Sequence, residues 1–261
     1  MQVGFNHILL NLDEGLATIT LNRPQVLNAL NNEVFAELGQ AADQVAEDDG
    51  VRVVIITGGE KVFAAGADIG EMSTARPVDI YRFGAVAHQA MNKVENLGKP
   101  VIAVINGYAL GGGLELVLAC DLRVASATAK FGCPEINLGI FPGGGATQRL
   151  PRLIGVARTK ELVYTGDLID AGTALAMGLV NRVAAAGEAM NEARKLAKKL
   201  MSKGAVALRM AKESINTGLN TDLASGINVE RQGFALLFST ADQKEGMRAF
   251  LEKRKPNFTG K

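Results

Sequence analysis

The stretch VIAVINGYALGGGLELVLAC, residues 101–120, decides the fold. It opens with a run of apolar and β-branched residues, 101–108, which predicts a strand buried on both faces. Three glycines at positions 111–113 then turn the chain into a short apolar helix over residues 114–120. A buried strand that leads directly into a helix is typical of α/β proteins whose strands pair mainly in parallel.

The chain upstream of this stretch also alternates between strands and helices. A turn centred on Gly15 joins two short segments of strand-forming residues and predicts a hairpin. Asn28 is expected to cap a helix, because apolar residues follow it at a period of 3.6. The expected upstream elements are strands at 8–11, 16–22 and 51–57 and helices from Asn28 onward and over 77–96.

Downstream, the alternation continues to about residue 185 and then stops. Residues 122–131 predict a third strand region, and the glycines at 143–145 open a helix that carries Arg149. No strand pattern follows, and four helices are expected at 191–200, 206–216, 223–238 and 243–253, the last of them capped by Thr240. We therefore expect an α/β core over residues 1–195 and a helical region over residues 196–261 that packs on the core or on a neighbouring subunit.

Composition narrows the class of function. The chain has 261 residues, and 48% are hydrophobic, which is enough for a sizeable core. With 28 basic and 27 acidic side chains, the formal net charge is +1, which argues against a protein built mainly to bind nucleic acid or an acidic membrane surface. No apolar run approaches the roughly 18 residues that cross a bilayer. The first residues lack the Lys or Arg of a signal peptide, so a cytoplasmic location is expected.

Several familiar catalytic motifs are missing. The sequence has no dinucleotide-binding Gly-x-Gly-x-x-Gly after a strand, no phosphate-binding loop, no Gly-x-Ser-x-Gly elbow and no His-Glu-x-x-His. Its two cysteines cannot form a disulfide framework or a four-cysteine metal site. The two histidines, His7 and His88, fit structural or solvated positions better than catalytic ones. The sequence therefore argues against nucleotide-dependent, zinc-dependent and serine–histidine chemistry.

Three glycine- and alanine-rich segments carry acidic residues and stand out instead. Residues 63–69 have small side chains that allow a ligand to approach the backbone, although tight packing explains them as well, and Asp68 is expected to cap a helix there. Residues 109–115 place unpaired N–H groups at a helix start, with Glu115 in the first turn as a catalytic or a capping residue. Residues 131–136 surround Glu135 with apolar and small groups, which raises its pKa unless it lies at the surface.

Taken together, these segments offer amide donors for a developing oxyanion and a pair of glutamates. That set fits proton transfer beside a carbonyl group, with neither a metal nor a cofactor. Further motifs extend through nearly the whole chain: Asn22-Arg23-Pro24, Asn28-Ala29-Leu30, 64–69, 106–113, Cys120-Asp121, Phe131-Gly132, Pro134-Glu135, 147–150 and 252–255. With these motifs, the chain resembles the crotonase (enoyl-CoA hydratase/isomerase) superfamily, and within it the short-chain enoyl-CoA hydratases.

The resemblance implies a fold and an assembly. The expected fold is α/β, a crotonase-like spiral of ββα units followed by a helical C-terminal trimerisation region. The expected assembly is a homo-oligomer, either a trimer or a dimer of trimers. The expected partner is an acyl-CoA thioester substrate, with no membrane partner, and nucleic acid is not expected as a ligand.

The resemblance also implies a role for each site residue. Glu115 and Glu135 would be the catalytic pair, and the N–H groups of Ala67 and Gly112 would form the oxyanion hole for the thioester carbonyl. The segment that lies against the coenzyme A substrate would consist of Ala65, Ala67, Asp68, Ile69, Gly70 and Gly112. No metal and no cofactor are expected, since coenzyme A is part of the substrate.

The activity implied is the reversible syn addition of water to a trans-2-enoyl-CoA, which gives the 3-hydroxyacyl-CoA. Both glutamates are present, as in members that hydrate enoyl-CoA, whereas many members with other activities lack one or both. An enoyl-CoA isomerase or a branched-chain hydratase of the methylglutaconyl type is the near alternative. An RNA-binding or non-catalytic scaffold is the distant one, and the intact glutamate pair and the net charge of +1 argue against it.

Overall fold

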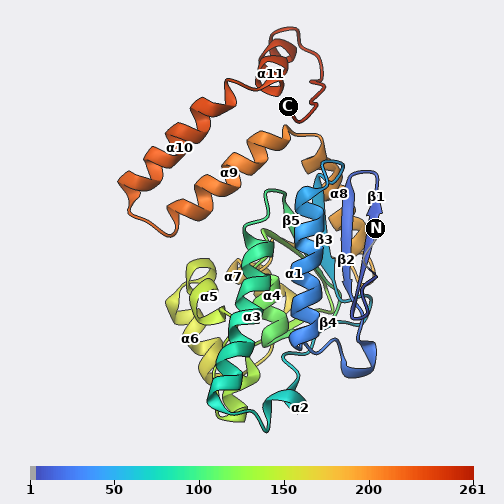
Figure 1. The fold of residues 1–261 in the computed structure, drawn as a ribbon, viewed down its shortest axis with the longest axis vertical. Helices are drawn as coiled ribbons and strands as arrows, with labels where there is room; N and C mark the ends of the chain where they lie inside the picture. Colours follow the sequence, from blue (N-terminus) through green and yellow to red (C-terminus); the bar gives the residue numbers. More distant parts are fainter. Residues whose placement is uncertain (1–3) are drawn as a thin grey trace.

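Two β-sheets form the frame of the protein, as seen in a computed structural model that describes residues 4–261 (Figure 1). Residues 1–3 lie outside the described residues. The prediction that there is no signal peptide rests in part on these three residues. In the larger sheet the strand order is β1-β2-β3-β5-β7-β10, and all neighbours are parallel except the β1–β2 hairpin. Its strands are β1 (Ile8–Asp13), β2 (Leu16–Leu21), β3 (Val53–Thr57), β5 (Val101–Ile105), β7 (Leu122–Ser126) and β10 (Arg182–Ala184).

The smaller sheet has the order β4-β6-β8-β9. Strands β4, β6 and β8 are parallel, and β9 runs antiparallel to β8. The strands are β4 (Val62–Ala64), β6 (Tyr108–Leu110), β8 (Lys130–Gly132) and β9 (Ile169–Asp170). The ends of these short strands carry the segments that the sequence singled out as a candidate site.

The chain passes repeatedly from the larger sheet to the smaller one and then into a helix. Strand β3 is followed by β4, β5 by β6, and β7 by β8, and a helical segment follows each pair. Each pair adds one strand to each sheet, so successive ββα units stack as a spiral. The expected α/β spiral of ββα units is confirmed.

Helices cover both faces of the larger sheet (Figure 1). The core beneath α1 and α3 includes Val54 and Ile56 of β3, whereas Val53 and Ile55 pack in a second cluster with α8. Burial on both faces explains why β3 and β5 are continuous apolar runs. The helical elements are η1 (Pro24–Val26), α1 (Asn32–Glu47), α2 (Ile69–Met72), α3 (Pro77–Glu95), α4 (Gly112–Leu118), η2 (Pro134–Leu138), α5 (Ala146–Ile154), α6 (Val156–Thr165), α7 (Ala171–Met177), α8 (Ala189–Met201), α9 (Ala205–Gly218), α10 (Leu223–Leu237) and α11 (Ala241–Leu251).

Two strand predictions are corrected by the structure. The runs 101–108 and 122–131 each contain two strands, one in each sheet, rather than a single strand. The break in the first run falls at Asn106 and Gly107, where a Cβ on Gly107 would collide with the carbonyl oxygen of Lys61. This close approach depends on the neighbouring chain segment, so the hydrophobic pattern of the run does not reveal it.

The helix predicted from Asn28 is also wrong at its start. Asn28 has a φ of +56° and lies outside the helix, which begins at Asn32. Asn31 is the actual cap, and its side chain accepts a hydrogen bond from the N–H of Val34 at 3.0 Å. Both asparagines suit a cap by residue type, and only the buried partners of Asn28, described below, separate them.

The last three helices project from the core (Figure 1). Helix α9 has no buried residue, and Lys212 ties it to the core by an ion pair with Asp121 at 2.8 Å. Helix α8 packs on the larger sheet, so the predicted division at 195/196 falls inside α8. Within residues 4–261, no helix combines the length and the apolar character needed to span a membrane.

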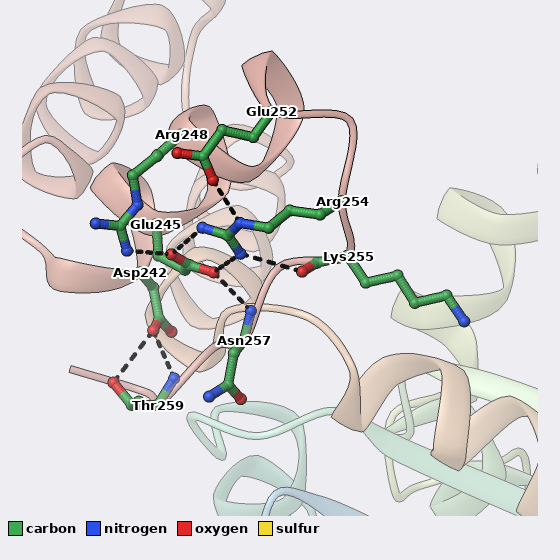
Figure 2. Close-up of polar contacts among 8 residues, drawn as sticks. All are labelled: Asp242, Glu245, Arg248, Glu252, Arg254, Lys255, Asn257 and Thr259. Atoms are coloured by element: carbon green, nitrogen blue, oxygen red, sulfur yellow. Dashed lines mark hydrogen bonds and ion pairs between the residues drawn. The ribbon is translucent and has the colours of Figure 1, made fainter.

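The C-terminal residues fold back onto α11 (Figure 2). Glu245 accepts hydrogen bonds from Arg254 at 2.6 Å and from the N–H of Asn257 at 2.9 Å. Asp242, which is almost fully buried, accepts from the N–H of Thr259 at 2.7 Å. These two carboxylates hold the C-terminal residues against α11. Thr240 is the N-cap of this helix, so its predicted capping role is confirmed.

Candidate active site

A glycine turn between β6 and α4 presents the first free amide. Gly111 has a φ of +49°, which L residues with a side chain rarely adopt, and its N–H donates to the carbonyl of Gly132 at 3.0 Å. Helix α4 begins at the next residue, Gly112, so its N–H has no partner within the helix. Among residues 4–261, no other acceptor takes this N–H either. It points to a position at the N-terminus of α4, where negative charge is stabilised.

The second free amide belongs to Ala67, in the loop between β4 and α2. A β-bridge with Leu30 uses the groups on either side of Ala67 and leaves the N–H of Ala67 itself without an acceptor among the described residues. A Cβ built on Gly112 would stand 3.3 Å from the amide nitrogen of Ala67. The two unpaired donors therefore lie side by side, in an arrangement that fits the oxyanion hole implied by the family resemblance.

Glu115 follows the amide of Gly112 by three residues. It lies in the first turn of α4 and is only 3% exposed. Its Oε1 accepts hydrogen bonds from the N–H groups of Gly144 at 2.7 Å and Ala146 at 3.0 Å. The carboxylate therefore binds a separate loop instead of capping α4. A Cβ on Gly144 would collide with Oε2 of Glu115, which explains why a glycine is needed there.

Glu135 approaches the same glycine turn from η2. A Cβ built on Gly111 would stand 2.6 Å from its Oε1. Its Oε2 is buried and has no hydrogen-bond partner among the described residues. An unpartnered buried carboxyl oxygen is costly when charged, so the site favours the protonated form of this group.

The two carboxyl groups perturb each other. Burial, with a smaller contribution from the nearby charge of Glu115, raises the pKa of Glu135 to about 7. Burial also raises the pKa of Glu115, while the two amide hydrogen bonds, His88 and Arg149 act in the opposite direction. Burial raises the pKa of the Cys133 thiol, and both glutamates add to that effect. The cluster can hold one proton between two carboxyl groups at neutral pH.

The segment predicted to contact coenzyme A forms the rim of the site. Ile69 and Gly70 are exposed, whereas Ala65, Ala67 and Asp68 are partly buried. The side chain of Asp68 caps α2 by accepting from the N–H of Gly70 at 3.2 Å, which confirms the capping role expected for it. Asp68 also pairs with Arg23 at 3.1 Å, so its carboxylate is already neutralised within the chain.

Sequence reasoning missed several polar residues that shape the site. His88, Asn92 and Glu95 lie one and two turns apart on one face of α3, and this face meets Arg149 and the loop before α5. Their spacing was readable as a polar stripe on an otherwise apolar helix face. His88, which we interpreted as structural or solvated, contributes to the electrostatics of Glu115. Within residues 4–261, no group of three or more His, Cys, Asp or Glu side chains is arranged to hold a metal ion.

Comparisons with known proteins identify the family of the chain. The family model described as enoyl-CoA hydratase/isomerase matches residues 11–261. The chain is 46% identical over 260 residues to the crotonyl-CoA hydratase of Syntrophomonas wolfei, an alignment that covers 99% of this chain and 100% of that protein. It is 44% identical over 251 residues to the short-chain-enoyl-CoA hydratase of Clostridium acetobutylicum, with 96% of each chain covered.

A solved structure of an enoyl-CoA hydratase has the same fold as this chain. The crystal structure of enoyl-CoA hydratase from Bacillus anthracis superimposes with a TM-score of 0.94 at 43% sequence identity. That match covers 98% of this chain and 100% of the other. A family model that matches nearly the whole chain and relatives of this identity and coverage show that the chain belongs to the enoyl-CoA hydratase/isomerase family.

Proposed function

We propose that the protein is an enoyl-CoA hydratase, a hydro-lyase that adds water reversibly and in syn geometry to a trans-2-enoyl-CoA. The observation that carries the proposal is that Glu115, in the first turn of α4, and Glu135, whose carboxyl group meets Gly111 just before α4, are close enough for their charges to interact. The unpaired amides of Ala67 and Gly112 lie at the start of the same helix. The names of the similar hydratases support it. The reaction uses only groups of the chain and of the substrate.

Glu115 acts as the base in this proposal. Its Oε1 accepts two backbone N–H groups, which favours the ionised form, and Arg149 and His88 favour it as well. Glu115 takes a proton from water while the water oxygen forms a bond to C3. The electron pair of the C2=C3 bond then shifts towards the thioester oxygen.

The amides of Ala67 and Gly112 hold the charge that develops on that oxygen. Each such donor contributes about 3 to 4 kcal/mol to transition-state stabilisation. Glu135, with a pKa raised to about 7, delivers its proton to C2 and completes the addition. The proton gained by Glu115 then returns to Glu135, and the pair is ready for another turnover.

Product analysis with crotonyl-CoA tests the activity. A hydratase consumes the conjugated double bond and gives 3-hydroxybutyryl-CoA, detected by chromatography and mass. A product of unchanged mass with a moved double bond would indicate an isomerase instead. Salt-dependent RNA binding without turnover would contradict the enzymatic proposal altogether.

We also propose that the chain assembles with copies of itself, as a trimer or a dimer of trimers. Large apolar side chains are exposed along the projecting helices, and Gly233 is the only buried residue of α10. The exposed residues include Leu219, Leu223, Ile227, Phe234, Phe238, Phe250 and Leu251. Large exposed apolar side chains concentrated in one helical region are typical of a subunit interface. Sedimentation analysis should give three or six times the chain mass of 27.5 kDa, and a monomer would contradict the proposal. The cytoplasmic location stays a prediction from the sequence.

A further inference from the structure

We infer that Arg149, clamped by Glu95 of α3, is the positioning residue that fixes the loop holding Glu115. The inference rests on the proposed hydratase activity, because it assigns Arg149 a role in that reaction. Arg149 touches none of the reacting atoms. It acts through the backbone of residues 143–146, which supplies both hydrogen bonds to Glu115.

The clamp between Arg149 and Glu95 is bidentate. Nε of Arg149 donates to Oε1 of Glu95 at 3.2 Å, and Nη2 donates to Oε2 at 2.6 Å. Nη2 also donates to Oδ1 of Asn92 at 3.1 Å. The arginine side chain is only 15% exposed, so this fork is held in one geometry and partly shielded from water.

The same guanidinium reaches the loop. Nη1 of Arg149 donates to the carbonyl oxygen of Gly144 at 3.3 Å. A Cβ on Gly145 would collide with Nη1, so the guanidinium lies directly against this part of the backbone. Gly144 is thus held at its carbonyl oxygen by Arg149, while its N–H binds Glu115.

Charge adds to geometry. The groups that face Glu115 are Arg149 from α5, His88 from α3, Glu135 from η2 and the nearby thiol of Cys133. Burial raises the pKa of Glu115, and the charge of Arg149 acts in the opposite direction, towards the ionised form of the base. Glu95 keeps the guanidinium beside the loop rather than in solvent. The ion pair therefore serves both the position and the protonation state of the base.

Steady-state kinetics with crotonyl-CoA separate the two effects. In Arg149→Gln we expect kcat to fall about 100-fold with KM changed less than about threefold, because a displaced base affects the chemical step rather than binding. The acidic limb of the pH profile of kcat/KM should move to higher pH. Arg149→Lys keeps the charge but not the fork, so its acidic limb should stay in place while kcat recovers only in part.

Three further variants make the test specific. Arg152→Gln removes an exposed arginine three residues along α5 and should leave kcat and the pH profile unchanged. Glu95→Gln should lower kcat, and the double variant Glu95→Gln/Arg149→Gln should be no worse than Arg149→Gln alone. A kcat within threefold of the parent in Arg149→Gln, or losses that multiply in the double variant, would overturn the inference.

A crystal structure of Arg149→Gln provides a readout that does not depend on turnover. We expect the loop at 143–146 to be displaced and the hydrogen bond from Gly144 to Glu115 to be lost. An undisplaced loop with both hydrogen bonds intact would overturn the positioning role, whatever the kinetics. If the parent does not hydrate crotonyl-CoA, the proposed function fails, and this structural arm still decides whether Arg149 holds the loop.

Discussion

Leu30 and Ala67 form an isolated parallel β-bridge between two loops that are distant in sequence. The N–H of Leu30 donates to the carbonyl of Gly66 at 2.8 Å, and the N–H of Asp68 donates to the carbonyl of Leu30 at 2.9 Å. In such a bridge the amide of the central residue faces away from its partner. The bridge therefore orients the N–H of Ala67 towards the site. The position of this N–H depends on the contacts that hold the loop around Leu30.

Asn28 holds that loop, and its replacement should be costly. Its side chain donates to the carbonyls of Gly58 at 2.8 Å and Phe63 at 3.1 Å and accepts from the N–H of Arg23 at 2.9 Å. Asn28→Gly removes these bonds but tolerates the φ of +56°, so we expect a loss of about 2 to 3 kcal/mol in unfolding free energy. Asn28→Ala adds the strain of a positive φ and should lose about 1 kcal/mol more.

Denaturant unfolding of both Asn28 variants measures these losses, with turnover of crotonyl-CoA as the second readout. Because the bridge aims the amide of Ala67, kcat should fall more than KM changes. Equal stability of the glycine and alanine variants would show that backbone strain at this position is unimportant. A kcat equal to that of the parent in both variants would show that the loop held by Asn28 does not position the oxyanion hole.

Gly112→Ala should damage the oxyanion hole without unfolding the protein. The added methyl group would stand 3.3 Å from the amide nitrogen of Ala67, in the space where the thioester oxygen is proposed to bind. We expect kcat to fall about 100- to 1000-fold, the range for loss of one oxyanion donor. Gly84→Ala in α3 is a matched control, because its methyl group meets no atom within 4 Å and should leave activity unchanged.

The sequence reveals the parts of this site that local rules govern. The apolar strands, the glycine turn and the acidic residue in the first turn of α4 follow from residue type and spacing, and the structure confirms each. The family resemblance supplied the pairing of Ala67 with Gly112. Residue spacing alone does not reveal it, because the two segments meet through β4 and β6 of the smaller sheet.

The structure adds what depends on tertiary contacts. Asn28 and Asn31 are both asparagines near a helix start, and only the buried carbonyls of residues 58 and 63 single out Asn28 as a loop anchor. Arg149 was placed on a helix by its sequence, but its partner Glu95 lies 54 residues away. Long-range polar pairs of this kind leave no periodic signal in either segment.

Glu115→Gln and Glu135→Gln should each abolish most of the activity while the fold persists. The glutamine introduced at position 115 keeps an oxygen that can accept from Gly144 and Ala146, so the loop should stay in place. Loss of a general base or acid costs about 10²- to 10⁴-fold in kcat. Because the two groups act on one transition state, the double variant should be far less damaged than the product of the single losses. Near-normal turnover in either single variant would refute its assigned role.

The pH profile of the parent should report the shared proton. The proposed mechanism needs Glu115 ionised and Glu135 protonated in the free enzyme. The pKa of Glu135 is raised to about 7, so kcat/KM for crotonyl-CoA should decline on the basic side with a midpoint near pH 7. The limb belongs to the pair as a whole, since the two groups are coupled. A profile that is flat from pH 6 to 9 would contradict the proton assignment.

The raised pKa of Glu135 also predicts how stability depends on pH. Its value rises from 4.5 in the unfolded chain to about 7 in the folded protein, so below pH 4.5 the group is protonated in both states. Between these values the folded state binds more protons than the unfolded state, and stability must fall as pH rises. Above pH 7 the loss is complete. Glu135→Gln cannot ionise, so it should gain stability over the parent across this window, by about 1 to 2 kcal/mol given the partial solvent access of the group.

Urea unfolding at pH 5 and pH 8.5, at one fixed protein concentration, measures the gain. The exposed Glu161→Gln in α6 is the control and should show the same difference from the parent at both pH values. A gain for Glu135→Gln that is equal at the two pH values would mean that the burial of this carboxyl group does not oppose its charge.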